Sequence, residues 1–280
     1  VKLRLLDSGS KYTESLRGAV EEPLEKAGTV YGDLLAVARE FDMPGPYTPE
    51  FEAFAAKLQP SANVQREDLS SLFTVTIDPK DAKDFDDALS IEDGEKEWKI
   101  GVHIADVAAY VRPGTKLDRE ARRRAFSSYI PGMFRPMLPR PLTQKISLRQ
   151  DADSLAHTVI LTVRKRDGAI TSTRRTFSLI RVNHRLNYDE VQEFIDGTAP
   201  ETWTDELKNA VALLTKATRK MRARRKRREE FLSFDTPEIR VLCDEATHEI
   251  QGIERREQRE SDELVEECML AANSAVAEEI

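Results

Sequence analysis

The order of apolar and polar residues along the chain follows two periods, and each period predicts a type of secondary structure. A period of two, typical of strands, occurs for example at residues 73–77 and 98–104. Apolar residues spaced by three or four positions, as at residues 31–41, are typical of one helix face. The pattern predicts strands at residues 1–6, 73–77, 98–104, 158–166 and 169–177, and helices at residues 31–41, 50–58, 117–125, 189–195, 205–228 and 264–277. Because strands and helices do not alternate regularly, we expect an α+β fold.

Turn residues divide these elements. Asp167-Gly168 lies between two alternating runs, which is a strong signal for a β-hairpin. Prolines and a glycine mark residues 130–139 as an irregular segment. The regular pattern is sparse before residue 70 and dense after it. We therefore expect residues 1–70 to be a connector or the tail of an upstream domain, and residues 71–280 to form the main domain.

The composition is that of a folded protein. Hydrophobic residues make up 40% of the 280 residues, and a chain of this size buries roughly three quarters of its unfolded surface. The two cysteines, Cys243 and Cys268, are too few for a disulfide framework, so we expect a cytoplasmic location. No apolar run approaches the roughly 20 residues that span a bilayer, so we expect no membrane contact. The net charge of −7, taken alone, argues against nucleic-acid binding.

A cluster of aspartates follows the strand predicted at residues 73–77. Its members are Asp78, Asp81, Asp84, Asp86 and Asp87. If residues 84–86 are extended, Asp84 and Asp86 share one face while Phe85 points to the core. Converging carboxylates repel one another unless a cation joins them. Oxygen ligands at this density suit Mg²⁺ or Mn²⁺, ions that commonly serve phosphoryl chemistry.

Two other interpretations of this cluster are available. A calcium loop requires glycine at its sixth position and glutamate at its twelfth, whereas Lys83 and Leu89 occupy these positions here. The calcium loop is therefore excluded. A solvated acidic loop, the commoner fate of an aspartate run, is not excluded. The spacing alone leaves the catalytic metal site and the solvated loop both open.

The same residues resemble a known family. Thr76-Ile77-Asp78 followed by Asp84-Phe85-Asp86-Asp87-Ala88 is similar to the active-site signature of the ribonuclease II and ribonuclease R exoribonucleases, which share the RNB domain. Further similar motifs follow in the same order at residues 102–107, 110–114, 136–139, 185–189 and 266–273. The resemblance extends from about Leu72 to Ile280.

The resemblance implies a fold and a domain organisation. Residues 71–280 would be part of an RNB catalytic domain, a mixed β-sheet flanked by helices that is incomplete at its C-terminal end. Residues 1–70 would be the tail and linker of an upstream cold-shock-like OB region. The apolar face of the helix predicted at residues 264–277 has no following partner, which also suggests that the chain is a fragment.

The resemblance also implies an activity. Enzymes of this family are Mg²⁺-dependent, with Mn²⁺ as a possible substitute, and they degrade single-stranded RNA processively from the 3′ end to nucleoside 5′-monophosphates. Asp78, Asp84, Asp86 and Asp87 would be the catalytic metal-site carboxylates, with Asp86 the one whose loss damages chemistry most. The family's phosphate-binding arginine lies beyond residue 280, so we expect the 280 residues alone to be nearly inactive. We expect no oligomer. The alternatives are an inactive RNA-binding regulator on the same fold and a structural fragment with a solvated aspartate loop.

Four further residues match RNA-binding positions of the family. Tyr129 would stack on the 3′-terminal base and Phe234 would close the stack of bases, because stacking tolerates any base. Tyr188 and Glu266 would sense the ribose, whose 2′-hydroxyl distinguishes RNA from DNA. The plain alternatives are core packing for the aromatic residues and a helix-surface charge for Glu266. The position of Tyr129 beside Pro131 in an irregular segment weakens the core interpretation for that residue.

A basic run changes the meaning of the net charge. Residues 219–228 hold eight Lys or Arg in ten, so the rest of the chain has 43 − 8 = 35 basic against 50 acidic residues. Such a run suits phosphate contact, and the resemblance places it near the RNA. It can equally be a solvated helix face or the ion-pair partner of acidic segments. His103 has no cysteine or histidine at metal-ligand spacing, so a structural histidine is the better interpretation than a zinc ligand.

Overall fold

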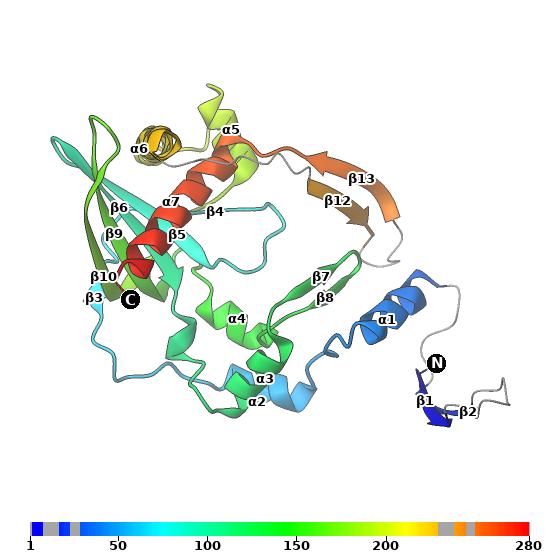
Figure 1. The fold of residues 1–280 in the computed structure, drawn as a ribbon. Helices are drawn as coiled ribbons and strands as arrows, with labels where there is room; N and C mark the ends of the chain where they lie inside the picture. The colour runs from blue at the N-terminus through cyan, green and yellow to red at the C-terminus, as the bar shows by residue number, and fades with distance from the viewer. Residues whose placement is uncertain (1, 8–16, 23–28, 229–237, 245–249, 280) are drawn as a thin grey trace.

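A seven-stranded mixed sheet forms the centre of the protein. The structure is a computed structural model that describes residues 2–7, 17–22, 29–228, 238–244 and 250–279. The sheet consists of β3 (Glu67–Asp68), β4 (Thr74–Asp78), β5 (Asp87–Asp93), β6 (Glu97–Ala105), β9 (Asp153–Arg164), β10 (Ile170–Arg181) and β11 (His184–Asn187). Its strand order is β11-β4-β5-β6-β9-β10-β3 (Figure 1). The pairs β11–β4 and β10–β3 are parallel, and the other neighbours are antiparallel.

Helices and three small two-stranded sheets surround this centre. The helices are α1 (Val30–Glu40), α2 (Pro49–Ala56), α3 (Lys116–Arg124), α4 (Arg140–Ile146), α5 (Tyr188–Ile195), α6 (Asp205–Arg228) and α7 (Glu260–Ala277), with a 3-10 turn at Val107–Ala109. The small antiparallel sheets pair β1 (Lys2–Asp7) with β2 (Arg17–Glu22), β7 (Ser128–Ile130) with β8 (Met133–Arg135), and β12 (Glu238–Cys243) with β13 (Ile250–Arg256). Across the ranges described above, no helix is both long enough and apolar enough to cross a bilayer.

Both faces of the large sheet are covered, which explains why its strands are so apolar. Successive residues of a strand point to opposite faces. On β5, Leu89 belongs to a core cluster shared with α5, α6 and α7, while Ala88 belongs to a second cluster shared with α2, α3 and α4. Trp98 and Ile100 on β6 are fully buried in the first cluster. The two helical layers lie on opposite sides of the sheet (Figure 1).

The hairpin predicted at Asp167-Gly168 is confirmed, and its turn contacts α6. β9 and β10 pair antiparallel over nearly their whole length around Asp167-Gly168. Gly168 has a φ of +67°, and a Cβ at this position would lie 2.5 Å from backbone atoms of Lys220 on α6. Only glycine permits both the turn and this close approach. The hairpin tip thus packs directly against α6.

The sequence pattern located each helix named above except α4 within a few residues but missed strands β3, β5 and β11 of the large sheet, and the mixed α+β fold is confirmed. Residues 130–139 were expected to be irregular, and this was wrong for Ile130 and for residues 133–135, whereas residues 136–139 are irregular as expected. Residues 128–135 form the β7–β8 hairpin around Pro131-Gly132, because Gly132 adopts a φ of +76° that closes the turn. In addition, α2 packs onto the main domain through Ala55, which is fully buried in the second core cluster. The boundary at residue 70 stays a prediction.

Candidate carboxylate site

Two neighbouring strand ends bring Asp78 and Asp87 together. Asp78 is the last residue of β4, a strand that is buried at every position, and the residue is only 8% exposed. Asp87 is the first residue of β5, where it pairs with Ile104 of β6. Since β4 and β5 are antiparallel neighbours, residues 79–86 connect them at this edge of the sheet. All four predicted carboxylates therefore come from one strand–loop–strand unit.

Burial and mutual repulsion make three of these carboxylates reluctant to ionise. Burial, together with the charges of Asp87 and Asp86, raises the pKa of Asp78 to about 7, and the charge of Arg185 opposes the shift. Burial and the charge of Asp86 raise the pKa of Asp87 to about 6. Partial desolvation and the charge of Asp84 also raise the pKa of Asp86. Asp78, Asp86 and Asp87 thus influence one another electrostatically at this edge of the sheet.

The backbone around Phe85 is tied to the second core cluster. The N–H of Phe85 donates to Oγ of Ser147 at 3.3 Å, and its carbonyl accepts from the N–H of Leu148 at 2.8 Å. The Phe85 ring packs against the second core cluster. The carbonyl of Asp86 accepts from the N–H of Ala105 at 2.8 Å. Anchoring Phe85 in this way leaves its neighbours Asp84 and Asp86 at the surface of the cluster.

Arg185 on β11 is a further member of the site to which sequence reasoning gave no role. Its guanidinium lies 4.4 Å from the centre of the Phe85 ring and donates to the carbonyls of Lys80, at 3.3 Å, and Ala82, at 3.1 Å. Its charge lowers the pKa of Asp78. Its place inside a family-like motif was the only signal in the sequence.

The donor set fits a hard divalent cation. Oδ2 of Asp78 is buried and, among the described residues, finds no hydrogen-bond partner. An unpaired buried carboxylate oxygen is costly, and a cation would satisfy it. The ligands on offer are carboxylate oxygens, which Mg²⁺ and Mn²⁺ prefer. Within the described ranges, no three His, Cys, Asp or Glu side chains already stand in a ligating arrangement.

Tyr129 stands close to these carboxylates. It lies on β7 and is 76% exposed, so it is not a core residue. Partial burial raises the pKa of its hydroxyl, and the charges of Asp84 and Asp86 raise that pKa further. Across the hairpin, Tyr129 pairs with Phe134, and the two ring centres are 4.8 Å apart. Phe134 was not singled out from the sequence.

Two other predicted RNA-binding residues, Tyr188 and Glu266, lie on helices rather than on the β7–β8 hairpin. Tyr188 begins α5 directly after Asn187, which pairs with Asp78, and its ring packs against the first core cluster. Glu266 is exposed on α7 and accepts a hydrogen bond from Gln258 at 2.5 Å. Phe234 lies outside the described residues. Cys268, also on α7, is fully buried in the first core cluster.

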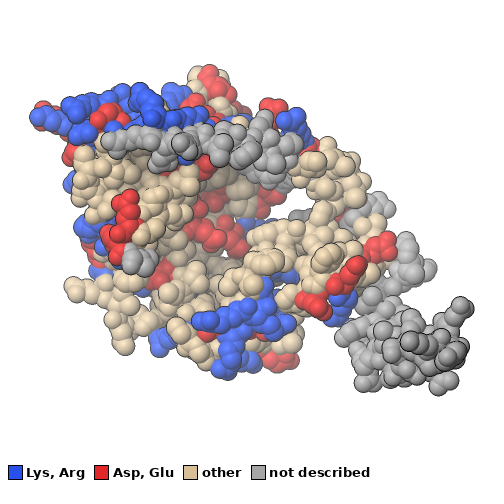
Figure 2. Space-filling view, in the orientation of Figure 1, with Lys and Arg blue, Asp and Glu red and all other residues tan. Residues whose placement is uncertain are grey.

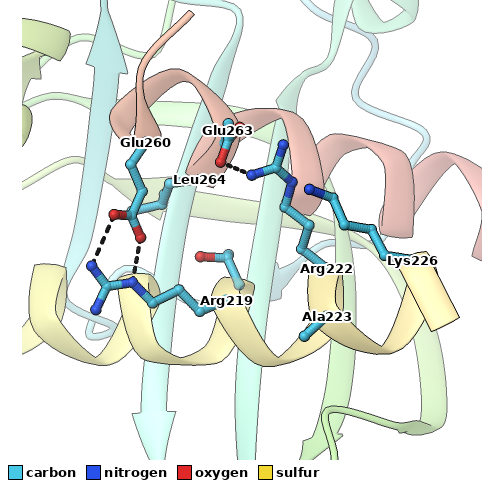
Figure 3. Close-up of a pocket in the computed structure, with 8 residues that line it drawn as sticks. Arg219, Arg222, Ala223, Lys226, Glu260, Glu263 and Leu264 are labelled. Carbon is cyan, nitrogen blue, oxygen red and sulfur yellow. Dashed lines mark hydrogen bonds and ion pairs between the residues drawn. The ribbon is translucent and has the colours of Figure 1, made fainter. Parts of the chain in front are cut away.

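The basic run on α6 is partly engaged within the protein. Arg219 pairs with Glu260, Arg222 with Glu263, and Arg225 with Glu267 at 2.8 Å; Figure 3 shows the first two pairs bridging α6 and α7. The ion-pair alternative therefore accounts for these three arginines. Lysine and arginine side chains also cover the outer side of α6 (Figure 2). Acidic side chains gather in the hollow at the middle of the face of the molecule that Figure 2 shows. Charge is segregated on the surface as it is in the sequence.

Comparison with known families assigns this fold and cluster to one class. The RNB domain matches residues 66–280, and the chain belongs to this family, that of ribonucleases II and R. The chain is 35% identical over 258 residues to ribonuclease R of Thermotoga maritima, covering 88% of this chain and 36% of the relative. It is 35% identical over 288 residues to exosome complex exonuclease RRP44 homolog A of Arabidopsis thaliana, covering 98% and 30%. The chain thus spans about a third of the length of these relatives.

Solved structures show the same fold. The structure of Mycoplasma genitalium RNase R in complex with ribose-methylated single-stranded RNA superposes with a TM-score of 0.88 at 23% identity, covering 94% of this chain and 41% of that one. Yeast Ssd1, described as a pseudonuclease, superposes with a TM-score of 0.73 at 18% identity, covering 99% and 34%. Active and inactive proteins share the fold, so the site residues must decide the activity.

Proposed function

We propose that this chain is the carboxylate-bearing part of a Mg²⁺-dependent 3′→5′ exoribonuclease that degrades single-stranded RNA processively to nucleoside 5′-monophosphates. The observation that carries the proposal is that Asp78, Asp84, Asp86 and Asp87 belong to one strand–loop–strand unit in which the pKa values of Asp78, Asp86 and Asp87 are raised. Their mutual repulsion favours a shared cation, and the names of the curated relatives include several ribonucleases.

In the proposed reaction, water attacks the phosphorus of the last phosphodiester and the bond from phosphorus to the 3′-oxygen breaks. The 3′-oxygen takes a proton and remains on the shortened RNA, while the phosphate stays on the 5′-oxygen of the released nucleotide. Mn²⁺ or Mg²⁺ at this site would supply a Lewis acid for the phosphate and make the attacking water more acidic.

The residues of this chain would position that chemistry. Asp78 and Asp87, fixed by their strands, form the rigid side of the ligand set, and Asp84 and Asp86 flank the anchored Phe85 on the other side. Tyr129 would hold the terminal base by stacking, which requires no particular sequence. A degrader that moves along RNA needs such sequence-independent contacts. Tyr188 and Glu266 remain proposed ribose-sensing residues.

The decisive experiment uses the full-length gene product and 5′-labelled single-stranded RNA. We expect stepwise shortening from the 3′ end, loss of activity in EDTA and its recovery with Mg²⁺. Asp86→Asn should lose activity by orders of magnitude and still bind RNA, because the amide is a poorer metal ligand of the same size. Asp81→Asn, an exposed residue of the same loop, is the matched control and should keep activity.

Other outcomes would contradict the proposal. Internal cuts in the labelled RNA, or full activity of Asp86→Asn, would contradict the mechanism. RNA binding without any Mg²⁺-dependent shortening in the wild type would instead support the inactive RNA-binding regulator. No carboxylate-dependent Mg²⁺ binding at all would support the solvated acidic loop.

A further inference from the structure

The end of α4 holds the backbone of Phe85 through both of its polar groups. The N–H of Phe85 donates to Oγ of Ser147 at 3.3 Å, and the carbonyl of Phe85 accepts from the N–H of Leu148 at 2.8 Å. Two consecutive residues therefore bind one residue of the aspartate segment. Because Asp84 and Asp86 are the direct neighbours of Phe85, this contact restrains the backbone from which both carboxylates project.

The segment between the two strands needs such support. Every residue from 79 to 86 is described by the structure, and none of them belongs to a helix or a strand. A loop backbone is more mobile than the sheet that it connects. Arg185 binds the first half of this loop, through the carbonyls of Lys80 and Ala82. The contact at Phe85 holds the second half, where Asp84 and Asp86 lie.

The hydroxyl of Ser147 can only accept a hydrogen bond from Phe85. Ser147 follows α4 as its C-cap, and its Oγ donates to the carbonyl of Thr143 at 2.9 Å. A serine hydroxyl has one proton and two lone pairs, so its lone pairs remain for the N–H of Phe85. Ser147 is 4% exposed, and without its oxygen the N–H of Phe85 would lose its acceptor.

The helix that carries Ser147 is itself firmly held. Ile146 and Leu148, on either side of Ser147, are at most 4% exposed and belong to the second core cluster. Lys145 donates to the carbonyl of Ala56 at the end of α2 and to that of Leu58 at 3.1 Å. The position of Ser147 is therefore set by the core and by α2, and not by the aspartate segment.

We propose that Ser147 is a positioning residue of the carboxylate site: by accepting the N–H of Phe85, it sets the direction in which Asp84 and Asp86 present their carboxylates to a divalent cation. This inference rests on the proposed function and adds a residue to it. Ser147 would touch neither the cation nor the RNA. Mg²⁺ requires nearly ideal ligand geometry, so a small rotation of the segment would weaken its binding.

A purely structural role for Ser147 predicts different results. Losing a buried hydrogen bond lowers the stability of the domain. If that is the whole role of Ser147, the molecules that remain folded bind a cation as the wild type does. If Ser147 positions the carboxylates, folded molecules that lack its hydroxyl bind the cation more weakly.

The experiment compares variants that change one acceptor. Ser147→Ala removes the acceptor, Ser147→Cys replaces it with a weakly accepting sulfur, and Ser147→Thr keeps a hydroxyl. Thr218→Val is the matched control, because Thr218 is also 4% exposed and its Oγ1 donates to the carbonyl of Leu214, four residues earlier on α6, at 2.9 Å. That helix packs in the first core cluster, on the other side of the sheet from α4.

Two measurements on the full-length protein need no catalysis. Electron paramagnetic resonance follows the binding of Mn²⁺ without RNA, and Asp86→Asn identifies the binding that belongs to the aspartates. Hydrogen exchange in EDTA, followed by mass spectrometry of overlapping peptides, reports whether the Phe85 amide is hydrogen-bonded in the metal-free protein. RNA binding in EDTA and RNA shortening in Mg²⁺ are measured alongside.

We expect Ser147→Ala to bind Mn²⁺ about threefold to tenfold more weakly than the wild type, as the loss of one hydrogen bond implies. Ser147→Cys should lie between them, and Ser147→Thr and Thr218→Val should bind Mn²⁺ normally. RNA binding in EDTA should be unchanged in all four variants. The Phe85 amide should be protected in the wild type and exchange faster in Ser147→Ala.

Wild-type Mn²⁺ affinity of folded Ser147→Ala would overturn the positioning role, and thermal unfolding in EDTA shows which variants are folded. An unprotected Phe85 amide in the wild type would overturn it too, and that result requires no variant to fold. Both outcomes leave the proposed function intact if the wild type shortens RNA. A wild type that neither binds Mn²⁺ at the aspartates nor shortens RNA would contradict the proposed function and this inference together.

Discussion

The guanidinium of Arg185 stacks over the ring of Phe85, with 4.4 Å between the central carbon and the ring centre. The same group donates hydrogen bonds to the carbonyls of Lys80 and Ala82 in the loop that follows β4. One side chain thus ties the early part of the aspartate segment to its later part. Because a flat guanidinium can stack and donate from several N–H groups at once, Arg185 is suited to hold the carboxylates in register.

We predict that Arg185→Gln raises the Mg²⁺ concentration that RNA shortening requires. Without the guanidinium, the loop after β4 loses two hydrogen bonds and its stacking contact, so the carboxylates are less ordered. The Mg²⁺ concentration for half-maximal RNA shortening should rise by at least about tenfold, because one hydrogen bond of a charged group is worth roughly 1.5–3 kcal/mol and about 1.4 kcal/mol is a factor of ten. Arg185→Lys should recover only part of this, since an ammonium cannot stack in the same way.

The matched control is Arg181→Gln, which removes an arginine from the preceding strand. Arg181 forms a surface ion pair with Asp153 in which both side chains are about half exposed. Such pairs contribute little, so this variant should keep the wild-type Mg²⁺ dependence. If Arg185→Gln also keeps it, Arg185 does not position the carboxylates.

We predict that Asp78→Asn stabilises the metal-free protein at pH 8. The folded pKa of Asp78, about 7, lies above the value of about 3.9 for an unfolded aspartate. The folded state therefore binds the proton more tightly, and stability is lost as the pH rises through 7. Asparagine has no charge to bury, so in EDTA at pH 8 the variant should unfold roughly 3–8 °C higher than wild type. The difference should shrink toward pH 5.

Thermal unfolding against pH, with and without Mg²⁺, measures this effect. Mg²⁺ should raise the melting temperature of wild type more than that of Asp78→Asn, because the ion offsets the buried negative charge. Asp81→Asn, at an exposed position, should follow wild type. Identical melting temperatures of wild type and Asp78→Asn at pH 8 in EDTA would argue against a strained carboxylate cluster.

The aspartates could be grouped from the sequence because they lie within ten residues, between the end of one strand and the start of its neighbour. Tyr129 and Phe134 were harder to connect, because their contact depends on the hairpin register around Pro131-Gly132. Arg185 reaches Phe85 only through the parallel pairing of β11 with β4, which no local pattern reveals. Long-range pairing thus limits what sequence analysis can predict about a site.

Tertiary contacts explain the predicted structural role of His103. Its Nε2 lies 2.9 Å from Oγ of Ser90 and its Nδ1 lies 2.8 Å from Oγ1 of Thr158, which in turn contacts Oγ of Ser178 at 2.6 Å. A Cβ on Gly101 would lie 2.4 Å from Oγ of Ser90, so glycine makes room for this buried chain of hydrogen bonds. Both ring nitrogens are engaged with hydroxyl groups, as expected of a structural histidine.

We predict that His103 weakens the fold in acid. Burial lowers its pKa to about 4, below the value of about 6.5 in an unfolded chain. Between these values the unfolded state binds the extra proton, so stability falls as the pH drops from 6.5 to 4, by at most about 1.4 kcal/mol per pH unit. His103→Gln should be less stable than wild type at pH 7.5 but should lose less stability on acidification. Urea unfolding across this range would show the change in slope, and parallel slopes would contradict the prediction.

The last prediction concerns the ion pairs between α6 and α7. Glu267 is 4% exposed and Arg225 is its partner, whereas the Arg219–Glu260 pair lies at the surface. Removing one partner of a buried pair leaves an uncompensated charge, while losing an exposed pair changes little. Arg225→Ala should therefore lower the free energy of unfolding by about 2–4 kcal/mol, and Arg219→Ala by less than about 1 kcal/mol.

Adding Glu267→Gln to Arg225→Ala separates the cost of the stranded charge from the loss of arginine packing. The double variant should recover part of the stability, because an amide costs less to bury without a cation. Urea unfolding of the wild type, the single variants and the double variant completes a double-mutant cycle. If Arg225→Ala is as mild as Arg219→Ala, this part of the basic run does not clamp the helices and its arginines are available for RNA phosphates.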